Sequence, residues 1–310
     1  MMKKTLLASA VAATLATTGA QAANIIDQDG TKVDVYGRLQ MELYNNGTVN
    51  QIQDNGSRIG FRASHKETEN LTVFANLEFR FKPDEASGQN ITPRNSFFGA
   101  QGDWGKFWVG NFDSIYFDYV SGRIELQQRD GVDYTSGSKN GRADSLAYEY
   151  KAGDLKFAVM AKHYVDVAAE EEAFNLQAAV SFNLGDLNLA VAFDQNSDED
   201  AVGGTGNARI GVGATYKLDA LTAHALAEME DGETRFALGA KYNLGVSDVY
   251  AAFSVTSEDF EAEGKYTDLE SAILVGATYK FSKPMFAYAE VAAGDKYEDS
   301  TFTVGARYSW

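Results

Sequence analysis

A seven-residue pattern recurs four times in the C-terminal half of the chain and constrains the fold more than any other feature. The copies begin at Val212, Leu238, Val275 and Val304, and each alternates apolar residues with glycine or polar residues. Alternation of this kind predicts a strand with one apolar face and one wet face. Each copy also has a tyrosine two residues before its last residue; these tyrosines are Tyr216, Tyr242, Tyr279 and Tyr308. Their shared depth indicates an aromatic girdle at a lipid–water boundary.

Strand-length runs with this alternation continue through the whole chain after its first 22 residues, and we count about sixteen. Most are roughly 8 to 14 residues long, which suits tilted strands that cross a bilayer. In the first run, Val33, Leu39 and Leu43 share one parity, while Arg38 and Glu42 share the other. The chain is therefore predicted to be all-β, a transmembrane antiparallel β-barrel in which the first and last strands pair.

The connections between these runs alternate in character. Tight turns such as Ala152-Gly153-Asp154 alternate with longer stretches rich in acidic residues, glycine or asparagine, such as Asn46 to Asn55 and Glu258 to Asp268. Short turns at one end and long loops at the other are typical of outer-membrane barrels. A barrel of about sixteen strands leaves an aqueous channel, so the sequence predicts passage of small solutes.

The N-terminus has the features of a secretory signal peptide. Lys3 and Lys4 precede a small apolar stretch, and Ala20-Gln21-Ala22 is a small-x-small cleavage site. This pattern divides the chain into a signal peptide, residues 1–22, and an exported barrel domain, residues 23–310.

Charge and composition exclude several classes of protein. The formal net charge is −17, and removal of Lys3 and Lys4 with the signal peptide leaves 25 basic against 44 acidic residues. Such an acidic chain is not expected to bind nucleic acid. There is no cysteine, and after the signal peptide no run of about 18 apolar residues could form a membrane helix. His65, His163 and His224 are scattered, and we predict no metal, cofactor or catalytic site.

Several short motifs, in this order and at this spacing, resemble the general diffusion porins of Gram-negative bacteria. They include Lys32-Val33-Asp34-Val35-Tyr36-Gly37-Arg38, Ser57-Arg58-Ile59-Gly60-Phe61, Arg94-Asn95-Ser96-Phe97-Phe98-Gly99 and Gly105-Lys106-Phe107-Trp108-Val109-Gly110-Asn111. Arg142-Ala143-Asp144-Ser145-Leu146-Ala147-Tyr148 and the aromatic C-terminus complete the series. The resemblance extends over essentially all of residues 23–310.

The resemblance implies a homotrimer in which each barrel has its own pore, narrowed by a long third loop that folds inward. Here that loop is the longest connection, Phe112 to Gly141. The resemblance also implies a basic cluster on the wall, opposite acidic residues of the loop. The wall residues are Arg38, Arg58, Arg94 and Arg142, with Arg80 added by its lumen parity, and the favoured loop acids are Glu125 and Asp118. Arg142 shares parity with outward residues and needs a bulge, or a strand that starts after Ala143, to point inward.

The expected partners follow from the same resemblance: outer-membrane lipid, lipopolysaccharide and the barrel assembly machinery, with Trp310 as the C-terminal assembly signal. The leading functional hypothesis is a passive channel for ions and small hydrophilic solutes, mildly cation-selective because of the acidic net charge. A substrate-selective porin, for example for an oligosaccharide, is the alternative and would need an ordered series of aromatic residues along the lumen. Tyr36, Tyr44, Phe74 and Trp108 have possible lumen parity but form no obvious ladder in the sequence. An outer-membrane hydrolase would need a partnered histidine, and the long loops are compatible with a role as adhesin or phage receptor.

Overall fold

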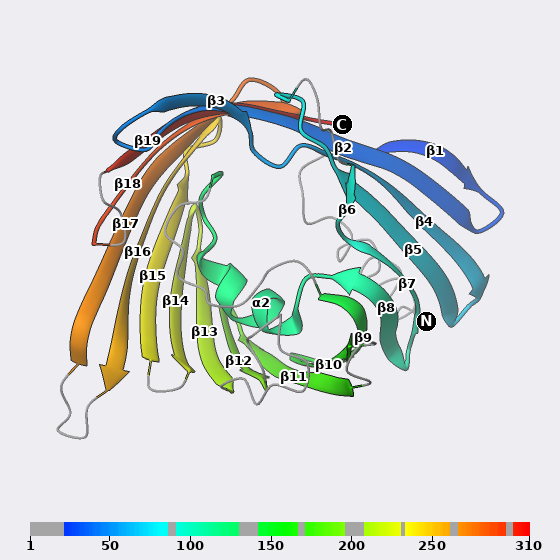
Figure 1. The fold of residues 1–310 in the computed structure, drawn as a ribbon. Helices are drawn as coiled ribbons and strands as arrows, with labels where there is room; N and C mark the ends of the chain where they lie inside the picture. Colours follow the sequence, from blue (N-terminus) through cyan, green and yellow to red (C-terminus); the bar gives the residue numbers. More distant parts are fainter. Residues whose placement is uncertain are drawn as a thin grey trace.

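The computed structural model describes residues 22–85, 91–129, 142–166, 171–195, 208–230, 233–260, 266–295 and 300–310 (Figure 1). Their strands form a single antiparallel sheet in which consecutive strands pair. Pairing of the last strand with β2 closes the sheet into a ring. Closure satisfies the hydrogen-bonding groups that an open sheet edge would expose to hydrocarbon.

Sixteen long strands make up the ring, as the sequence predicts. They are β2 (Thr31–Asn45), β4 (Arg58–Thr68), β5 (Leu71–Arg80), β7 (Ser96–Gly102), β8 (Gly105–Phe112), β9 (Arg142–Ala152), β10 (Leu155–Asp166), β11 (Glu171–Leu184), β12 (Leu187–Asp194), β13 (Arg209–Leu218), β14 (Leu221–Glu230), β15 (Glu233–Asn243), β16 (Ser247–Phe260), β17 (Tyr266–Lys280), β18 (Met285–Ala293) and β19 (Thr301–Ser309). There are also three short strands, β1 (Ala23–Gln28), β3 (Asn50–Asp54) and β6 (Thr92–Pro93). β1 and β3 pair with β2, and β6 pairs with β5. No helix among the described residues has the length and apolarity needed to cross a membrane.

Two of the predicted long connections are shorter than expected. β3 lies within Asn46 to Asn55 and pairs with the end of β2. The stretch Glu258 to Asp268 is largely strand, because β16 extends to Phe260 and β17 begins at Tyr266. In both places cross-strand pairing extends strand structure into acidic or polar sequence, where no apolar alternation marks it.

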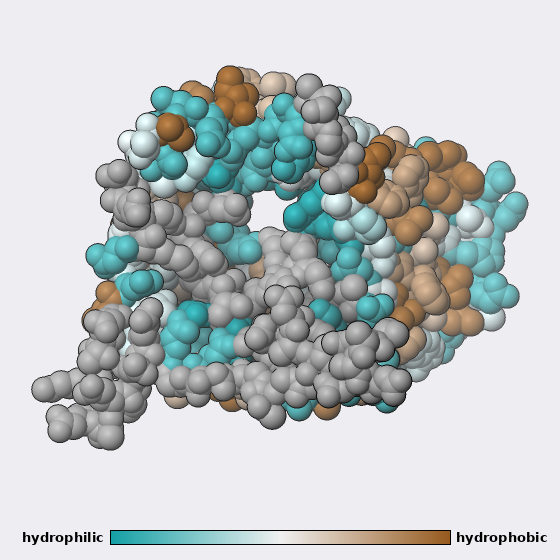
Figure 2. All heavy atoms as spheres, viewed as in Figure 1, coloured by the Kyte–Doolittle hydropathy of each residue, from teal (hydrophilic) through white to brown (hydrophobic). Residues whose placement is uncertain are grey.

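The outer face of the strands is apolar and the inner face is polar, which is the reverse of a water-soluble protein. In β2, Leu39 and Leu43 are 41% and 45% exposed, whereas Gln40 and Glu42 are 0% and 2% exposed. Figure 2 shows apolar side chains over the outer surface of the strands, and an opening through the molecule with hydrophilic side chains at its border. Apolar residues outside and polar residues inside are the arrangement that a lipid environment stabilises.

The glycine of the recurring pattern lies on the inner face of each strand and leaves room for a large neighbour. Gly276 and Gly305 lie directly opposite Tyr250 and Tyr288. A Cβ on either glycine would come within 2.4 Å or less of the opposing tyrosine ring. Aromatic side chains that cover a glycine on the next strand stabilise sheets. Glycine is therefore required here by close packing.

Candidate functional site

Residues 113–129, after β8, form the segment that we call the cross-barrel segment. It contains α2 (Ile115–Tyr119) and the 3-10 helix η1 (Ser121–Ile124), which Figure 1 shows within the ring of strands. Ser114 caps α2, because its hydroxyl accepts a hydrogen bond from the Phe117 N–H at 3.1 Å. Such caps favour helix initiation. Sequence analysis expected only a loop here; the serine before an apolar stretch was the signal that it missed.

One half of the cross-barrel segment is bound to β11, β12 and β13. The Tyr116 N–H donates to Gln177 Oε1 at 3.1 Å. Arg123 donates to Asn188 Oδ1 at 2.5 Å and to Thr215 Oγ1 at 2.9 Å. Burial lowers the pKa of Arg123 to about 10, so this guanidinium remains charged at neutral pH.

Two of the recurring glycines make room for this segment. A Cβ on Gly213 would lie 2.6 Å from Arg123 Cδ, and one on Gly239 would lie 2.9 Å from Leu126 Cδ1. The same glycine position that receives a tyrosine in β17 and β19 thus receives the cross-barrel segment in β13 and β15.

The other end of the segment is bound to β18 and β2. The backbone N–H groups of Gln128 and Arg129 donate to the two carboxylate oxygens of Glu290 at 2.5 and 3.0 Å. The Arg129 guanidinium forms an ion pair with Glu42 and lies 3.7 Å from the centre of the Tyr44 ring. Contacts on both sides hold residues 113–129 across the interior of the ring.

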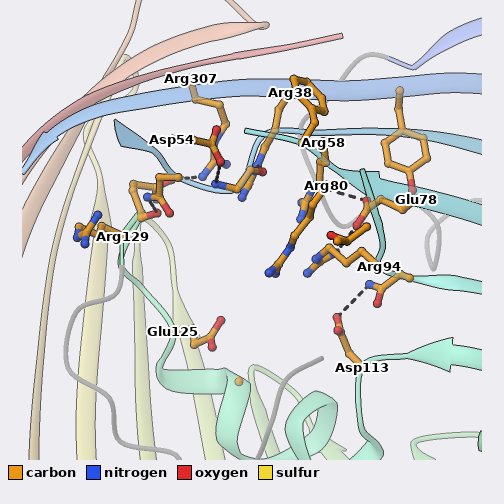
Figure 3. Close-up of a pocket in the computed structure, with 18 of the residues that line it drawn as sticks. Arg38, Asp54, Arg58, Glu78, Arg80, Arg94, Asp113, Glu125, Arg129 and Arg307 are labelled. Atoms are coloured by element: carbon orange, nitrogen blue, oxygen red, sulfur yellow. Dashed lines mark hydrogen bonds and ion pairs between the residues drawn. The ribbon is translucent and has the colours of Figure 1, made fainter. Parts of the chain in front are cut away.

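A cavity of about 1300 Å³ lies between the cross-barrel segment and the wall formed by β2, β4 and β5. Four of the five arginines predicted for the basic wall line it: Arg38, Arg58, Arg80 and Arg94. Both predicted loop acids, Asp118 and Glu125, line it as well. Figure 3 shows the arginines along one side and Glu125 with Asp113 on the other.

The fifth arginine, Arg142, begins β9, and its side chain lies outside the described residues. The pairing of β8 with β9 shifts between Gly110 and Phe112, and Phe112 pairs with Arg142. This irregularity is the bulge that an inward Arg142 would require; its direction stays a prediction.

Part of the wall charge is neutralised locally. Glu78 forms an ion pair with Arg58 at 3.5 Å and another with Arg94. Just after the end of β5, Lys82 Nζ donates to Glu85 at 2.6 Å, and this hydrogen bond raises the pKa of Lys82.

The structure adds residues that sequence analysis did not place at the site. Among the described residues, the basic ones lining the cavity are Arg38, Arg58, Arg62, Arg80, Lys82, Arg94, Arg129, Lys241 and Arg307, and the acidic ones are Asp54, Glu78, Glu85, Asp113, Asp118 and Glu125. Lys241 and Arg307 occupy the wet position immediately before the tyrosine in two copies of the recurring pattern. Because this position faces the interior of the barrel, sequence analysis could have predicted both residues from it.

The residues predicted to lie near lipid are on the outer face. Tyr216, Tyr242, Tyr279 and Tyr308 are 44–51% exposed and lie near the ends of their strands at the short turns. A Cβ on Gly37 would lie 2.5 Å from the Trp310 ring, and the backbone groups of these two residues exchange hydrogen bonds. The girdle and assembly roles of these aromatic residues stay predictions.

Comparison with known proteins decides the family. The family model described as Gram-negative porin matches residues 8–300. The chain belongs to the Gram-negative porin family. The family and the fold are those of channel proteins.

The relatives of this porin extend over its whole length. It is 29% identical to a monosaccharide porin of Halomonas sp and 26% identical to outer membrane porin F of Escherichia coli. These matches cover 98% and 99% of this chain and 98% and 97% of the relatives. Among solved structures, Salmonella typhi OmpF superposes with a TM-score of 0.76 at 18% identity, covering 93% of this chain and all of that one. Vibrio cholerae OmpT, in a trimer form, gives a TM-score of 0.69 at 20% identity, with 91% and 100% covered.

The aromatic and histidine residues of this porin bear on the alternative functions. Phe74 and Trp108 are buried in a packed cluster with Phe97 and Phe112, so they do not form an exposed ladder. His65 Nδ1 lies 2.7 Å from the Thr31 hydroxyl, and His224 Nδ1 lies 3.1 Å from the Thr215 hydroxyl. His65 Nε2 also lies 3.5 Å from a Glu67 carboxylate oxygen, and His163 Nε2 lies 3.4 Å from one of Glu172. A carboxylate can orient an imidazole, but neither of these two pairs lines the charged cavity.

Proposed function

We propose that this porin is a passive diffusion channel of the outer membrane for ions and small hydrophilic solutes. The observation that carries the proposal is a charged cavity inside a closed ring whose outer face is apolar. The cross-barrel segment and the arginine wall form the narrow section, and opposed charges on its two sides orient water and dipolar solutes. Arginine suits the wall because it stays charged and its donors are held in a rigid plane.

The proposed assembly is a homotrimer in the outer membrane, reached after cleavage of residues 1–22. The trimer form of the Vibrio cholerae relative and the outer-membrane names of the relatives support it. Outer-membrane lipid and lipopolysaccharide would surround the apolar face, and the barrel assembly machinery would recognise the end of the chain at Trp310.

The described lining argues against the mild cation selectivity predicted from the net charge. Nine lysine and arginine side chains line the main cavity, against six aspartate and glutamate side chains. A permeating ion responds to charges within about 8 Å at physiological salt, and hence to this lining more than to the net charge of −17. The proposed channel therefore admits anions at least as readily as cations. A reversal potential of cation sign across a potassium chloride gradient would contradict this.

A substrate-selective porin is the second candidate, favoured by the relative named monosaccharide porin. Tyr36, Phe81, Phe97 and Phe117 line the main cavity, and of the four candidate ladder residues Tyr44, Phe74 and Trp108 are not in its lining. A sugar ladder would need such residues along the path, so the passive channel is the better-supported proposal. Concentration-dependent block by one neutral sugar class would favour the selective channel.

Single-channel recording in a planar bilayer tests the proposal. We expect the detergent-extracted protein to insert as open channels that close in three equal steps, one for each barrel of a trimer. Heat-unfolded protein at the same concentration is the matched control. Absence of conductance steps from the folded protein would refute the channel, whereas single-step closure would refute only the trimer.

A further inference from the structure

A smaller cavity of about 360 Å³ continues from the main cavity toward the short-turn end of the barrel. It reaches the turn between β17 and β18, where Ser282, Lys283 and Pro284 line it. Arg38 and Arg307 line both cavities. The two cavities are therefore parts of one path, and a solute that crosses it meets both arginines.

The lining of the smaller cavity is strongly basic. Among the described residues it contains Arg38, Arg58, Lys241, Lys280, Lys283 and Arg307, against the acid Asp248. Asp248 is shared, because Lys280 lies 3.0 Å and Lys241 lies 3.5 Å from the same carboxylate oxygen. One carboxylate between two lysines leaves a surplus of positive charge.

Arg38 and Arg307 contribute two charges to this surplus, and both donate to neutral acceptors. Arg38 Nε donates to the Gly56 carbonyl at 2.8 Å. Arg307 donates through Nε to Gln40 Oε1 at 2.8 Å and through Nη2 to Gln128 Oε1 at 2.7 Å. Within the described part of the chain, neither guanidinium has a carboxylate within the 4.0 Å of an ion pair.

Asp54 lies near the two arginines, but its carboxylate is hydrogen-bonded to backbone groups. Its carboxylate oxygens accept hydrogen bonds from the N–H groups of Gly56 and Ser57 at 2.9 to 3.2 Å. These bonds hold the turn before β4, and the Asp54 carboxylate does not reach ion-pair distance of either arginine. Figure 3 shows Arg307, Arg38 and Asp54 next to one another at this part of the wall.

Both guanidinium groups are held in place. A Cβ on Gly56 would lie 2.8 Å from Arg38 Nη2, so the turn closes around this side chain. Arg307 is fixed by its two glutamine partners and lies 4.8 Å from the centre of the Phe286 ring. A fixed guanidinium loses little conformational entropy when it binds an anion, and its planar donors match carboxylate and phosphate.

We propose that Arg38 and Arg307, with Lys241 on the same cavity, form a binding subsite for the carboxylate or phosphate group of a small solute. The inference rests on the proposed channel function and names its preferred solute class: small organic anions ahead of neutral molecules of equal size. Unneutralised positive charge inside a narrow channel with low-dielectric walls concentrates such anions at this point of the path.

Block of single-channel current tests the subsite. Gluconate, glucose 6-phosphate and glucose are compared as probes, because they are similar in size and differ in charged group. We expect gluconate, glucose 6-phosphate or both to reduce the current reversibly at concentrations at which glucose has no effect. The double variant Arg38→Gln with Arg307→Gln should raise the half-blocking concentration at least tenfold.

Two further variants separate the subsite from general charge and from folding. Lys82→Gln removes one positive charge from a residue that lines the main cavity but not the smaller one, and should change the half-blocking concentration less than twofold. Arg38→Lys with Arg307→Lys keeps the charge and should restore block to within about threefold. Equal block by gluconate and glucose, or unchanged block in the double glutamine variant, would overturn the subsite. Failure of the wild-type protein to conduct would instead refute the channel itself.

Discussion

Glu290 offers the most direct test of how the cross-barrel segment is held. Its carboxylate accepts hydrogen bonds from the backbone N–H groups of Gln128 and Arg129, and from the Tyr250 hydroxyl at 2.6 Å. The change Glu290→Gln keeps the size of the side chain. It also replaces one oxygen with an amide NH2 group that faces donors instead of accepting from them. At least one backbone donor at the end of the segment therefore loses its acceptor.

The magnitude follows from these contacts. A hydrogen bond to a charged group contributes about 1.5–3 kcal/mol, and the glutamine loses the charge as well as one acceptor. We expect Glu290→Gln to weaken docking of residues 128 and 129 by about 2–3 kcal/mol, which is roughly a 30- to 150-fold shift of the docking equilibrium. Tyr250→Phe removes one donor that does not belong to the segment, and should weaken docking by only about 1 kcal/mol.

A spin label measures the effect. The chain has no cysteine, so Gln127→Cys supplies a single attachment site next to the docked residues, and this variant serves as the reference. We expect Glu290→Gln to add a fast-moving component to the label spectrum while the barrel keeps its resistance to heat unfolding. Glu42→Gln removes the ion pair with Arg129 and should act in the same direction. If the spectrum of Glu290→Gln matched the reference in an intact barrel, the carboxylate would not hold the segment.

Two further predictions concern the barrel wall. Gly305→Ala would place a Cβ 2.3 Å from Tyr288 Cζ, and we expect it to lower the unfolding free energy by about 1–3 kcal/mol. Denaturant titration in detergent measures this loss, and an unchanged midpoint would contradict the packing argument. Val275→Arg, on the outer face of β17, should cost about 2–4 kcal/mol in lipid, whereas Tyr279→Arg on the same face near the short turn should cost about 1 kcal/mol or less from the charge. Equal losses for the two arginine variants in lipid vesicles would contradict the assignment of Tyr279 to the membrane boundary.

Much of the architecture was predictable because it depends on local sequence. In a strand the side chains alternate between the two faces, so the parity of Leu39 and Glu42 assigns one to lipid and the other to the interior without knowledge of their neighbours. The alternation of tight turns and longer connections likewise predicts a barrel with two unlike ends. These features led to about sixteen strands and to an inward-facing Arg38, whereas Arg58 and Arg94 were expected at the wall from the resemblance to porins.

What the sequence could not supply is which residues meet across the interior. Arg307 binds Gln40, 267 positions earlier in the chain, because closure of the ring makes β19 the neighbour of β2. The recurring glycine is followed by alanine and, three residues on, by tyrosine in every copy. It receives Tyr250 or Tyr288 in two strands and residues of the cross-barrel segment in two others.

The physical reason is that face and depth are set by the local backbone and the bilayer, whereas contacts in the lumen depend on how the sheet closes and where the cross-barrel segment docks. The net charge of −17 belongs to the sequence. The basic surplus around Arg38 and Arg307 exists only because the fold brings these side chains together and occupies Asp54 and Glu78 with other partners.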